Sequence, residues 1–148
     1  MNMGFYKYTL SNTWHELKAI KTLGDCIRFN RLKAKLTQAE LANKIGLDKN
    51  TIYLLEKNKA LLHVKFILKI EEILSCSLVG FDEYYDFARD TSTYIINIRN
   101  KLGLKRKGFS KLIGVHSSTL LKWETGKSYI TRMHMNKLSF FFLDNNIS

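Results

Sequence analysis

The side chains of this sequence that could do chemistry are mainly cations. Among 148 residues, 24 Lys and Arg stand against 13 Asp and Glu, giving a net charge of +11. Residues 1–80 hold 13 basic and 7 acidic residues and residues 81–148 hold 11 and 6, so the halves carry +6 and +5. Because the surplus is not gathered in a tail, it indicates a folded protein with an anionic partner, most often nucleic acid. A basic protein without such a partner is the plainer alternative.

Residues that could act as nucleophiles, acid–base catalysts or metal ligands are scattered. Cys26 and Cys76 show no CxxC spacing, which is typical of small core residues. The four histidines have no acid or nucleophile at a motif spacing, and no phosphate-binding glycine loop occurs. The pattern predicts a protein that is not an enzyme and holds no metal or other cofactor. His116 stands at the expected start of a helix, and we interpret it as a cap or a phosphate contact.

The composition predicts a helical, cytoplasmic protein. Hydrophobic residues make up 45% of the chain, enough for a core, and the absence of Pro favours helices. The first residues lack the apolar run and cleavage site of a signal peptide. No apolar stretch approaches the ~20 residues that a membrane span needs.

The elements that must position these side chains occur twice. Residues 36–59 and 104–127 match at an offset of 68, and ten pairs of residues between positions 27 and 137 are identical at that offset. Apolar residues keep to one helical face in both copies, and each copy has the size of a small all-helical domain. The sequence predicts a tandem duplication with a 1–23 extension, a first domain at 24–80, a linker at 81–90 and a second domain at 91–148.

Helix boundaries are readable in the first copy. Thr37 and Glu40 form a capping box, and Gly46 supplies the turn that ends that helix. Asp48 is expected to cap the next helix and Asn58 to end it in a left-handed conformation. A further helix is expected at about residues 63–74.

The sequence makes structural predictions for segments outside the first copy as well. In the second copy, Lys105 and Gly108 replace the capping box, which weakens that helix by roughly 1 kcal/mol or more. Residues 13–16 form a second capping box in the extension. The aromatic residues of the linker are expected to pack between the domains, and those near the C-terminus to supply an interface: Tyr84, Tyr85 and Phe87, then Phe140, Phe141 and Phe142.

Arg31, followed by LTQAELANKIGLDKNTIYLLEKNK and FILKIEEILSCSL, resembles the phage-repressor (Cro/repressor, Xre-type) helix-turn-helix family. The likeness covers about residues 24–80 and, more loosely, 91–143. It implies an all-α fold of tandem lambda-repressor-like helix-turn-helix domains, in which the third helix of each domain enters the DNA major groove. It also implies two structural ion pairs, Arg31–Glu56 and Arg99–Glu124. The departures are Asn58 in place of Gly, no Pro after Lys59, and an altered second helix in the second copy.

The resemblance further implies which residues contact DNA. Asn50 is expected to pair with adenine, Lys49 with guanine, and Leu54 with a thymine methyl group. For Tyr53, DNA contact and a surface aromatic ring that contacts no DNA are equal alternatives. For each Lys, DNA contact and a solvated side chain are equal alternatives. The base-facing sets differ, which predicts unlike half-sites: Lys49, Asn50, Thr51, Tyr53 and Leu54 in the first copy, and Ser117, Ser118, Thr119, Leu121 and Lys122 in the second. The expected phosphate contacts are Gln38, Lys59, Arg106 and Lys127.

Together these features predict a sequence-specific regulator that binds double-stranded DNA, a transcriptional repressor of prokaryotic or phage origin in the cytoplasm, associated with the nucleoid. The sequence leaves open whether the protein forms a homodimer, and no small-molecule effector is evident. One alternative is a protein-binding regulator, such as an antitoxin or a phage inhibitor, that uses this fold. Another is an architectural factor in recombination or replication. Strong salt dependence of duplex binding separates the DNA-binding hypotheses from the protein-binding one.

Overall fold

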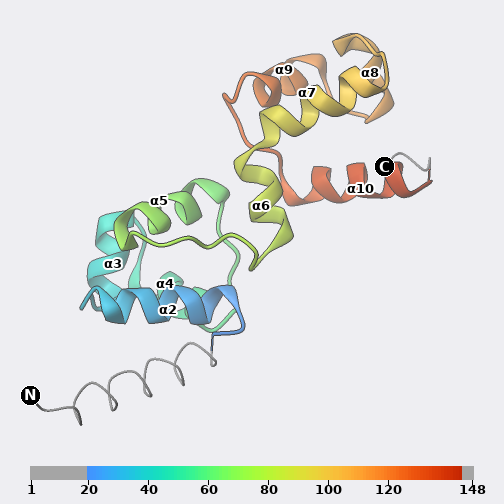
Figure 1. Ribbon diagram of the computed structural model, residues 1–148. Helices are drawn as coiled ribbons and strands as arrows, with labels where there is room; N and C mark the ends of the chain where they lie inside the picture. The colour runs from blue at the N-terminus through green and yellow to red at the C-terminus, as the bar shows by residue number, and fades with distance from the viewer. Residues whose placement is uncertain (1–19, 145–148) are drawn as a thin grey trace, which may run out of the picture. The chain divides into compact units, whose positions relative to one another are not determined.

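The computed structural model describes the backbone of residues 20–144 and the side chains of residues 20–139. The regular secondary structure of this part of the chain consists of helices alone, without a strand (Figure 1), so the predicted all-α class is confirmed. The chain divides into two compact units, Met1–Phe81 and Asp82–Ser148. The first unit contains α2 (Leu23–Lys33), α3 (Gln38–Ile45), α4 (Lys49–Glu56) and α5 (Val64–Leu74), and the second contains α6 (Glu83–Arg89), α7 (Thr91–Lys101), α8 (Arg106–Leu112), α9 (Ser117–Glu124) and α10 (Arg132–Asp144).

Local hydrogen bonds define the helix ends of the first unit as predicted. Thr37 and Glu40 form the capping box that starts α3, and Gly46 ends α3 at a φ of +86°. The Asp48 side chain accepts from the Thr51 amide at 2.9 Å and so caps α4. Asn58 adopts the left-handed conformation with φ +56°. These caps satisfy amides and carbonyls that a helix end otherwise leaves unpaired.

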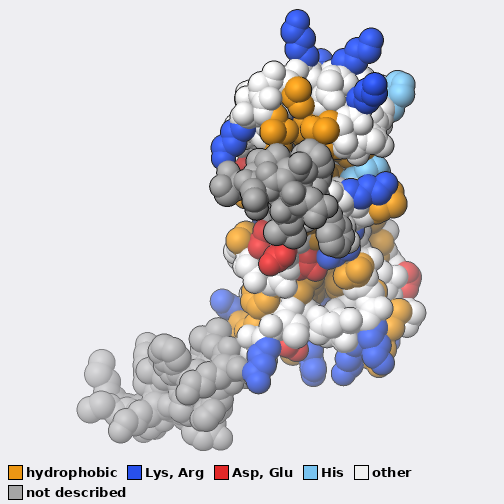
Figure 2. Space-filling model, turned by 90° about the vertical axis from the view of Figure 1, so that its right-hand side faces the viewer, with side chains coloured by type: hydrophobic (Ala, Val, Ile, Leu, Met, Phe, Trp, Pro, Cys, Tyr) orange, Lys and Arg blue, Asp and Glu red, His pale blue; other side chains and the backbone are white. Residues whose placement is uncertain are grey.

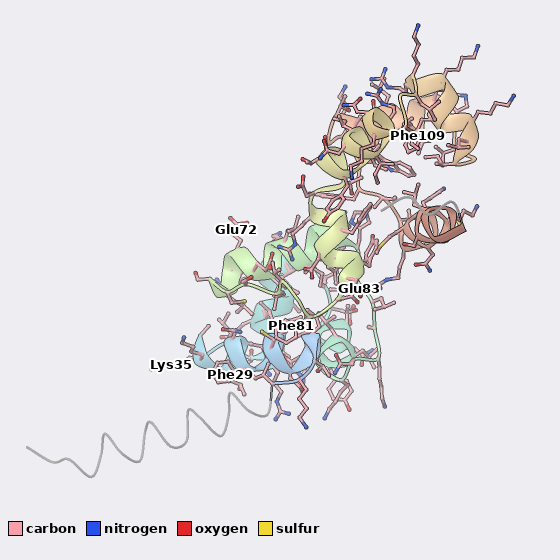
Figure 3. The ribbon with its side chains drawn as sticks, turned by 45° about the vertical axis from the view of Figure 1, so that its right-hand side comes forward. Phe29, Lys35, Glu72, Phe81, Glu83 and Phe109 are labelled. Carbon is pink, nitrogen blue, oxygen red and sulfur yellow. The ribbon has the colours of Figure 1, made fainter. Side chains whose placement is uncertain are left out.

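The two units share fully buried positions of the repeat. In the first unit α2 packs against α4 and α5, and α3 packs against the same two helices. Ile27, Leu41 and Ile52 are fully buried there. Their equivalents at the offset of 68 are Ile95, Phe109 and Leu120, which are fully buried between α7, α8 and α9 (Phe109 is labelled in Figure 3). Burial of apolar side chains at matching positions gives both units the same three-helix centre.

The segment predicted as a linker belongs to the second unit. Residues 83–89 form α6, which packs on α7. The Tyr84 hydroxyl donates to the Ile130 carbonyl at 3.0 Å, and the Arg132 guanidinium lies over the rings of Tyr84 and Tyr85 at 4.3 and 5.1 Å. Phe87 packs on Tyr94 with 4.8 Å between ring centroids. These contacts hold α6 within the second unit; packing of the same rings between the two units stays a prediction.

The last helix is held differently in the two copies. In the first unit α5 packs on α2 and α3. In the second unit α10 is joined to the start of α6 by the ion pair between Arg132 and Asp82, whose nitrogen and oxygen lie 2.9 Å apart. The His134 ring of α10 also meets the Trp123 ring of α9 edge-on at 5.2 Å. Helix α6 therefore supports the start of α10 in the second unit.

Two predictions concern residues that the structure does not describe. The capping box of residues 13–16 lies outside the described residues. The side chains of residues 140–142 do as well, so the expected aromatic interface there stays a prediction.

The second helix of the second copy lacks a side-chain cap, as its sequence predicts. Lys105 precedes α8 with no side-chain hydrogen bond to the first turn. A Cβ added at Gly108 meets only the Leu104 side chain, at 3.8 Å, which is ordinary contact. The glycine is therefore not required by space, and it weakens α8 through backbone entropy alone.

We expect Gly108→Ala to raise the free energy of unfolding of the second unit by about 0.5–1 kcal/mol, because Ala has the higher helix propensity and fits the space. A thermal melt of the full chain measures this. Gly114→Ala is the matched control: Gly114 has φ +68°, where a side chain is strained, so this variant should be destabilised instead. A Gly108→Ala melt at or below wild type would contradict the prediction.

Candidate nucleic-acid interface

A buried ion pair fixes α4 against α2 in the first unit. The Arg31 guanidinium donates through Nε to Glu56 Oε1 at 2.5 Å and through Nη2 to Glu56 Oε2 at 3.0 Å. Its Nη1 donates to the Leu36 carbonyl at 2.8 Å. Only 8% of the Arg31 side chain and 3% of the Glu56 side chain are exposed. A two-bond pair of planar groups restricts both distance and angle, so it sets the pitch of α4.

Gln38 joins this network from the first turn of α3. Its Nε2 donates to Glu56 Oε2 at 2.8 Å, and the side chain is half-buried. The residue predicted to contact phosphate is thus also the link that orients α3 against the end of α4. A phosphate contact by the remaining amide hydrogen of Gln38 stays a prediction.

The second unit repeats the network with one cation more. Arg99 Nε donates to Glu124 Oε1 at 2.6 Å, and Arg99 Nη1 donates to the Leu104 carbonyl at 3.1 Å. Arg106, at the position of Gln38, donates through Nε to Glu124 Oε2 at 2.7 Å. The Arg106 side chain is 44% exposed, against 20% for Arg99. One buried carboxylate therefore serves two guanidinium groups, and the outer one faces solvent.

Hydrogen bonds of Asn58 form a second link between α2 and α4, which the sequence did not predict. The Asn58 side chain accepts from the Gly24 amide at 3.0 Å and donates to the Thr22 hydroxyl at 2.8 Å. In the second unit Ser92, at the position of Gly24, donates its hydroxyl to the Glu124 carbonyl at 2.6 Å. Aligning the copies would have placed Gly24 and Ser92 together, but nothing local to either residue points to a contact across more than 30 positions.

The first turn of α4 presents two polar side chains to solvent. Lys49 and Asn50 are exposed, and within the described part of the chain the Asn50 side-chain amide makes no hydrogen bond. The Thr51 hydroxyl is different, since it bonds to the Asp48 carboxylate. This hydroxyl holds the pKa of Asp48 below its usual value. Of the predicted base-reading residues here, Lys49 and Asn50 are thus available, whereas Thr51 is engaged in the cap.

The outer face of α4 continues with Tyr53 and Leu54. Tyr53 is 44% exposed and Leu54 is half-buried, whereas Ile52 and Leu55 face the core. The predicted division of α4 into an inner and an outer face is therefore present in the structure. Lys59 follows this helix and is also exposed.

The first turn of α9 is occupied by its own contacts. The His116 ring caps the helix, accepting from the Ser118 amide at 3.3 Å, and its Nδ1 lies 2.7 Å from the Ser118 hydroxyl. The Ser117 hydroxyl lies 2.9 Å from the Ser110 hydroxyl of α8. Thr119 is half-buried, and Lys122 is exposed. Both serines predicted to read bases are therefore paired within the protein.

Further along, Leu121 stands at the position of Tyr53 and is 42% exposed. Lys127 follows α9 as Lys59 follows α4, and it is exposed. Contact of any of these residues with DNA stays a prediction.

The fold and the network agree with a comparison against known protein families. A helix-turn-helix family model matches the chain twice, at residues 27–81 and 95–139. The chain therefore belongs to this helix-turn-helix family, of the Xre/lambda-repressor-like kind, and carries two tandem copies as predicted. No curated protein and no solved structure matches it.

Two further features are absent from the described residues. None of their helices is both long and apolar enough to cross a membrane. Among the same residues, no three His, Cys, Asp or Glu side chains are grouped as a metal site would need.

Proposed function

We propose that this protein is a transcriptional repressor that binds specific sequences in double-stranded DNA. The observation that carries the proposal is the exposed first turn of α4, with Lys49 and Asn50, on a helix whose pitch is set by the buried Arg31–Glu56 pair. A helix held in this way can enter the major groove, where Asn pairs with adenine and Lys with guanine. Repression follows when the bound protein covers a promoter. Such a protein acts in the cytoplasm, on the DNA of the nucleoid.

The two units are proposed to bind one duplex. Each has a recognition helix, α4 or α9, and an exposed Lys after it, Lys59 or Lys127. A tandem pair needs no second chain to occupy two adjacent major grooves, which lie about 34 Å apart on one side of the duplex. Footprinting of the full chain should therefore protect two regions spaced by about one helical turn.

Selection of bound duplexes from a random pool identifies the preferred site. On that site we expect Asn50→Ala to weaken binding by roughly 1–3 kcal/mol and to relax preference at one position, because only the Asn amide recognises both edge groups of adenine. Binding to random duplexes should change little. Affinities for the selected and random duplexes, measured at one salt concentration, test this.

Lys59→Ala is the matched control, since a phosphate contact carries no sequence information. It should weaken binding to all duplexes alike and reduce the slope of log affinity against log salt by about 1. If Asn50→Ala weakens selected and random duplexes equally, α4 is not the base-reading helix.

A protein-binding regulator is the second candidate, and one observation favours it. Tyr53 and Leu121 occupy equivalent positions on α4 and α9 and are both more than two-fifths exposed. Exposed aromatic and aliphatic side chains are typical anchors of protein interfaces. If no duplex binds with marked salt dependence, the protein-binding function is the one to pursue.

A further inference from the structure

The basic residues are distributed unequally between the two copies. Residues 91–139 contain ten Lys and Arg and one acidic residue, Glu124. The 49 equivalent positions of the first copy, residues 23–71, also contain ten Lys and Arg, but five acidic residues. The net charges are therefore +9 and +5, and the even division between the halves of the chain hides this because four acidic residues lie in residues 82–90.

The difference is concentrated at the start of the second helix of the motif. Thr37-Gln38-Ala39-Glu40 of the first copy has a net charge of −1, and Lys105-Arg106-Lys107-Gly108 at the same positions has +3. At the start of the recognition helix, Asp48 is replaced by His116. In helix-turn-helix proteins the recognition helix lies in the groove and the preceding helix crosses the backbone, so these positions are near phosphates.

The added cations are open to solvent. Lys105, Arg106 and Lys107 are all exposed, and no ion pair of the described residues involves Lys105 or Lys107. Arg106 is held in place by Glu124 through one nitrogen, Nε. Figure 2 shows Lys and Arg side chains projecting from the upper end of the second unit.

Helix stability does not account for these residues. The first copy starts its second helix with a complete capping box, and the second copy starts the same helix with no side-chain cap. Loss of such a cap costs about 1 kcal/mol. In the second copy Lys105 stands at the position of the cap and Gly108 at that of the carboxylate. Neither Lys105 nor Lys107 stabilises the start of α8 by a side-chain cap or an ion pair, which indicates that these cations serve a ligand.

In the first turn of the recognition helix of the second copy both serines are already paired, and Lys122 is the exposed polar residue that remains beyond it. The Ser117 hydroxyl is paired with Ser110 and the Ser118 hydroxyl with His116. The next outward residue, Leu121, is apolar. At the start of α4, by contrast, the Asn50 amide makes no hydrogen bond among the described residues.

We propose that the second unit is a sequence-independent clamp on the phosphate backbone of duplex DNA, and that the first unit alone reads the base sequence. The clamp consists of Lys105, Arg106 and Lys107. This inference rests on the proposed function and deepens it. It explains why two copies of one fold differ in charge at the same positions: one copy supplies specificity, and the other supplies affinity for any sequence.

The test compares full-length variants on a random-sequence duplex and on the selected site. K105T/R106Q/K107A gives the second copy the residues of the first. Because each phosphate contact adds about 0.9 to the slope of log affinity against log salt, the slope should fall by about 2–3 on both duplexes. Base preference on the selected site should stay as in wild type. The variant is expected to fold, because Thr restores the cap and Gln can donate to Glu124 as Gln38 does to Glu56; circular dichroism verifies this.

Two further variants complete the design. R28A/K65A/K137A removes three exposed cations outside the second and third helices of either copy and should lower the slope much less. T37K/Q38R/A39K moves the clamp residues into the first copy and should strengthen binding to the random duplex. Equal slopes for the two charge-removing variants, or an altered base preference in K105T/R106Q/K107A, would overturn the clamp. Wild-type protein that binds no duplex would instead overturn the proposed function itself.

Discussion

Glu56→Ala lowers the free energy of unfolding of the first unit by roughly 2–4 kcal/mol. Both side chains of the Arg31–Glu56 pair are more than nine-tenths buried, so the variant leaves a guanidinium without its partner in a site with little water. It also removes the acceptor of Gln38. For a unit of this size the melting temperature should fall by about 10 °C or more, which a thermal melt of the full chain detects.

The double variant Arg31→Met/Glu56→Leu is the control. It removes the isolated charge together with the pair, so it should cost less than Glu56→Ala alone if desolvation causes the loss. Glu124→Ala tests the second network, where Arg99 and Arg106 lose one shared acceptor. The loss of unfolding free energy per guanidinium should be smaller than in Glu56→Ala, because the side chains of Arg99 and Arg106 are more exposed than that of Arg31. Unchanged melts for both Glu variants would show that the pairs do not stabilise the units.

Gly24→Ala should destabilise the first unit by about 1–3 kcal/mol, although Ala is the better helix former. A Cβ at Gly24 would lie 2.6 Å from the Leu55 carbonyl oxygen and 2.7 Å from that of Glu56. These are backbone atoms at the end of α4, so the clash cannot be relieved by turning a side chain. The move of α2 away from α4 would also stretch the bond between the Gly24 amide and Asn58.

Ser92→Ala in the second unit is the matched control for Gly24→Ala. Ser92 stands at the same position and already has a Cβ, so Ala there removes one hydroxyl hydrogen bond, to the Glu124 carbonyl, without a clash. We expect a cost of about 1 kcal/mol. Thermal melts of both variants measure the difference. A Gly24→Ala melt equal to wild type would mean that the close approach of α2 and α4 is not required.

The close packing of α2 against α4 at Gly24 should also affect DNA binding. Gly24 and the Arg31–Glu56 pair hold α4 at two points along α2, near the start and near the end of that helix. A shift at either point tilts the recognition helix with its Lys49 and Asn50. We therefore expect Gly24→Ala to weaken binding to the selected duplex more than to a random one, because base contacts need correct geometry and phosphate attraction does not.

The sequence by itself determined the helices, the duplication and the family. The capping box of Thr37 and Glu40, the turn at Gly46 and the cap at Asp48 act between residues at most four positions apart. Such local signals are readable without a fold. Equal spacing of apolar residues in two copies then predicted the shared core, since Ile27/Ile95, Leu41/Phe109 and Ile52/Leu120 are buried in both units.

Only the tertiary structure decided which polar side chains are available to a ligand. Asn50 and Ser118 both lie in the first turn of a recognition helix, yet His116 occupies the Ser118 hydroxyl and the Asn50 amide is left open among the described residues. The structure also placed 83–89 as a helix of the second unit. It brought Gln38 and Arg106 to the carboxylates of Glu56 and Glu124, each 18 residues away. Contacts at such separations depend on how helices pack, and packing is set by the whole core and not by the residues between the partners.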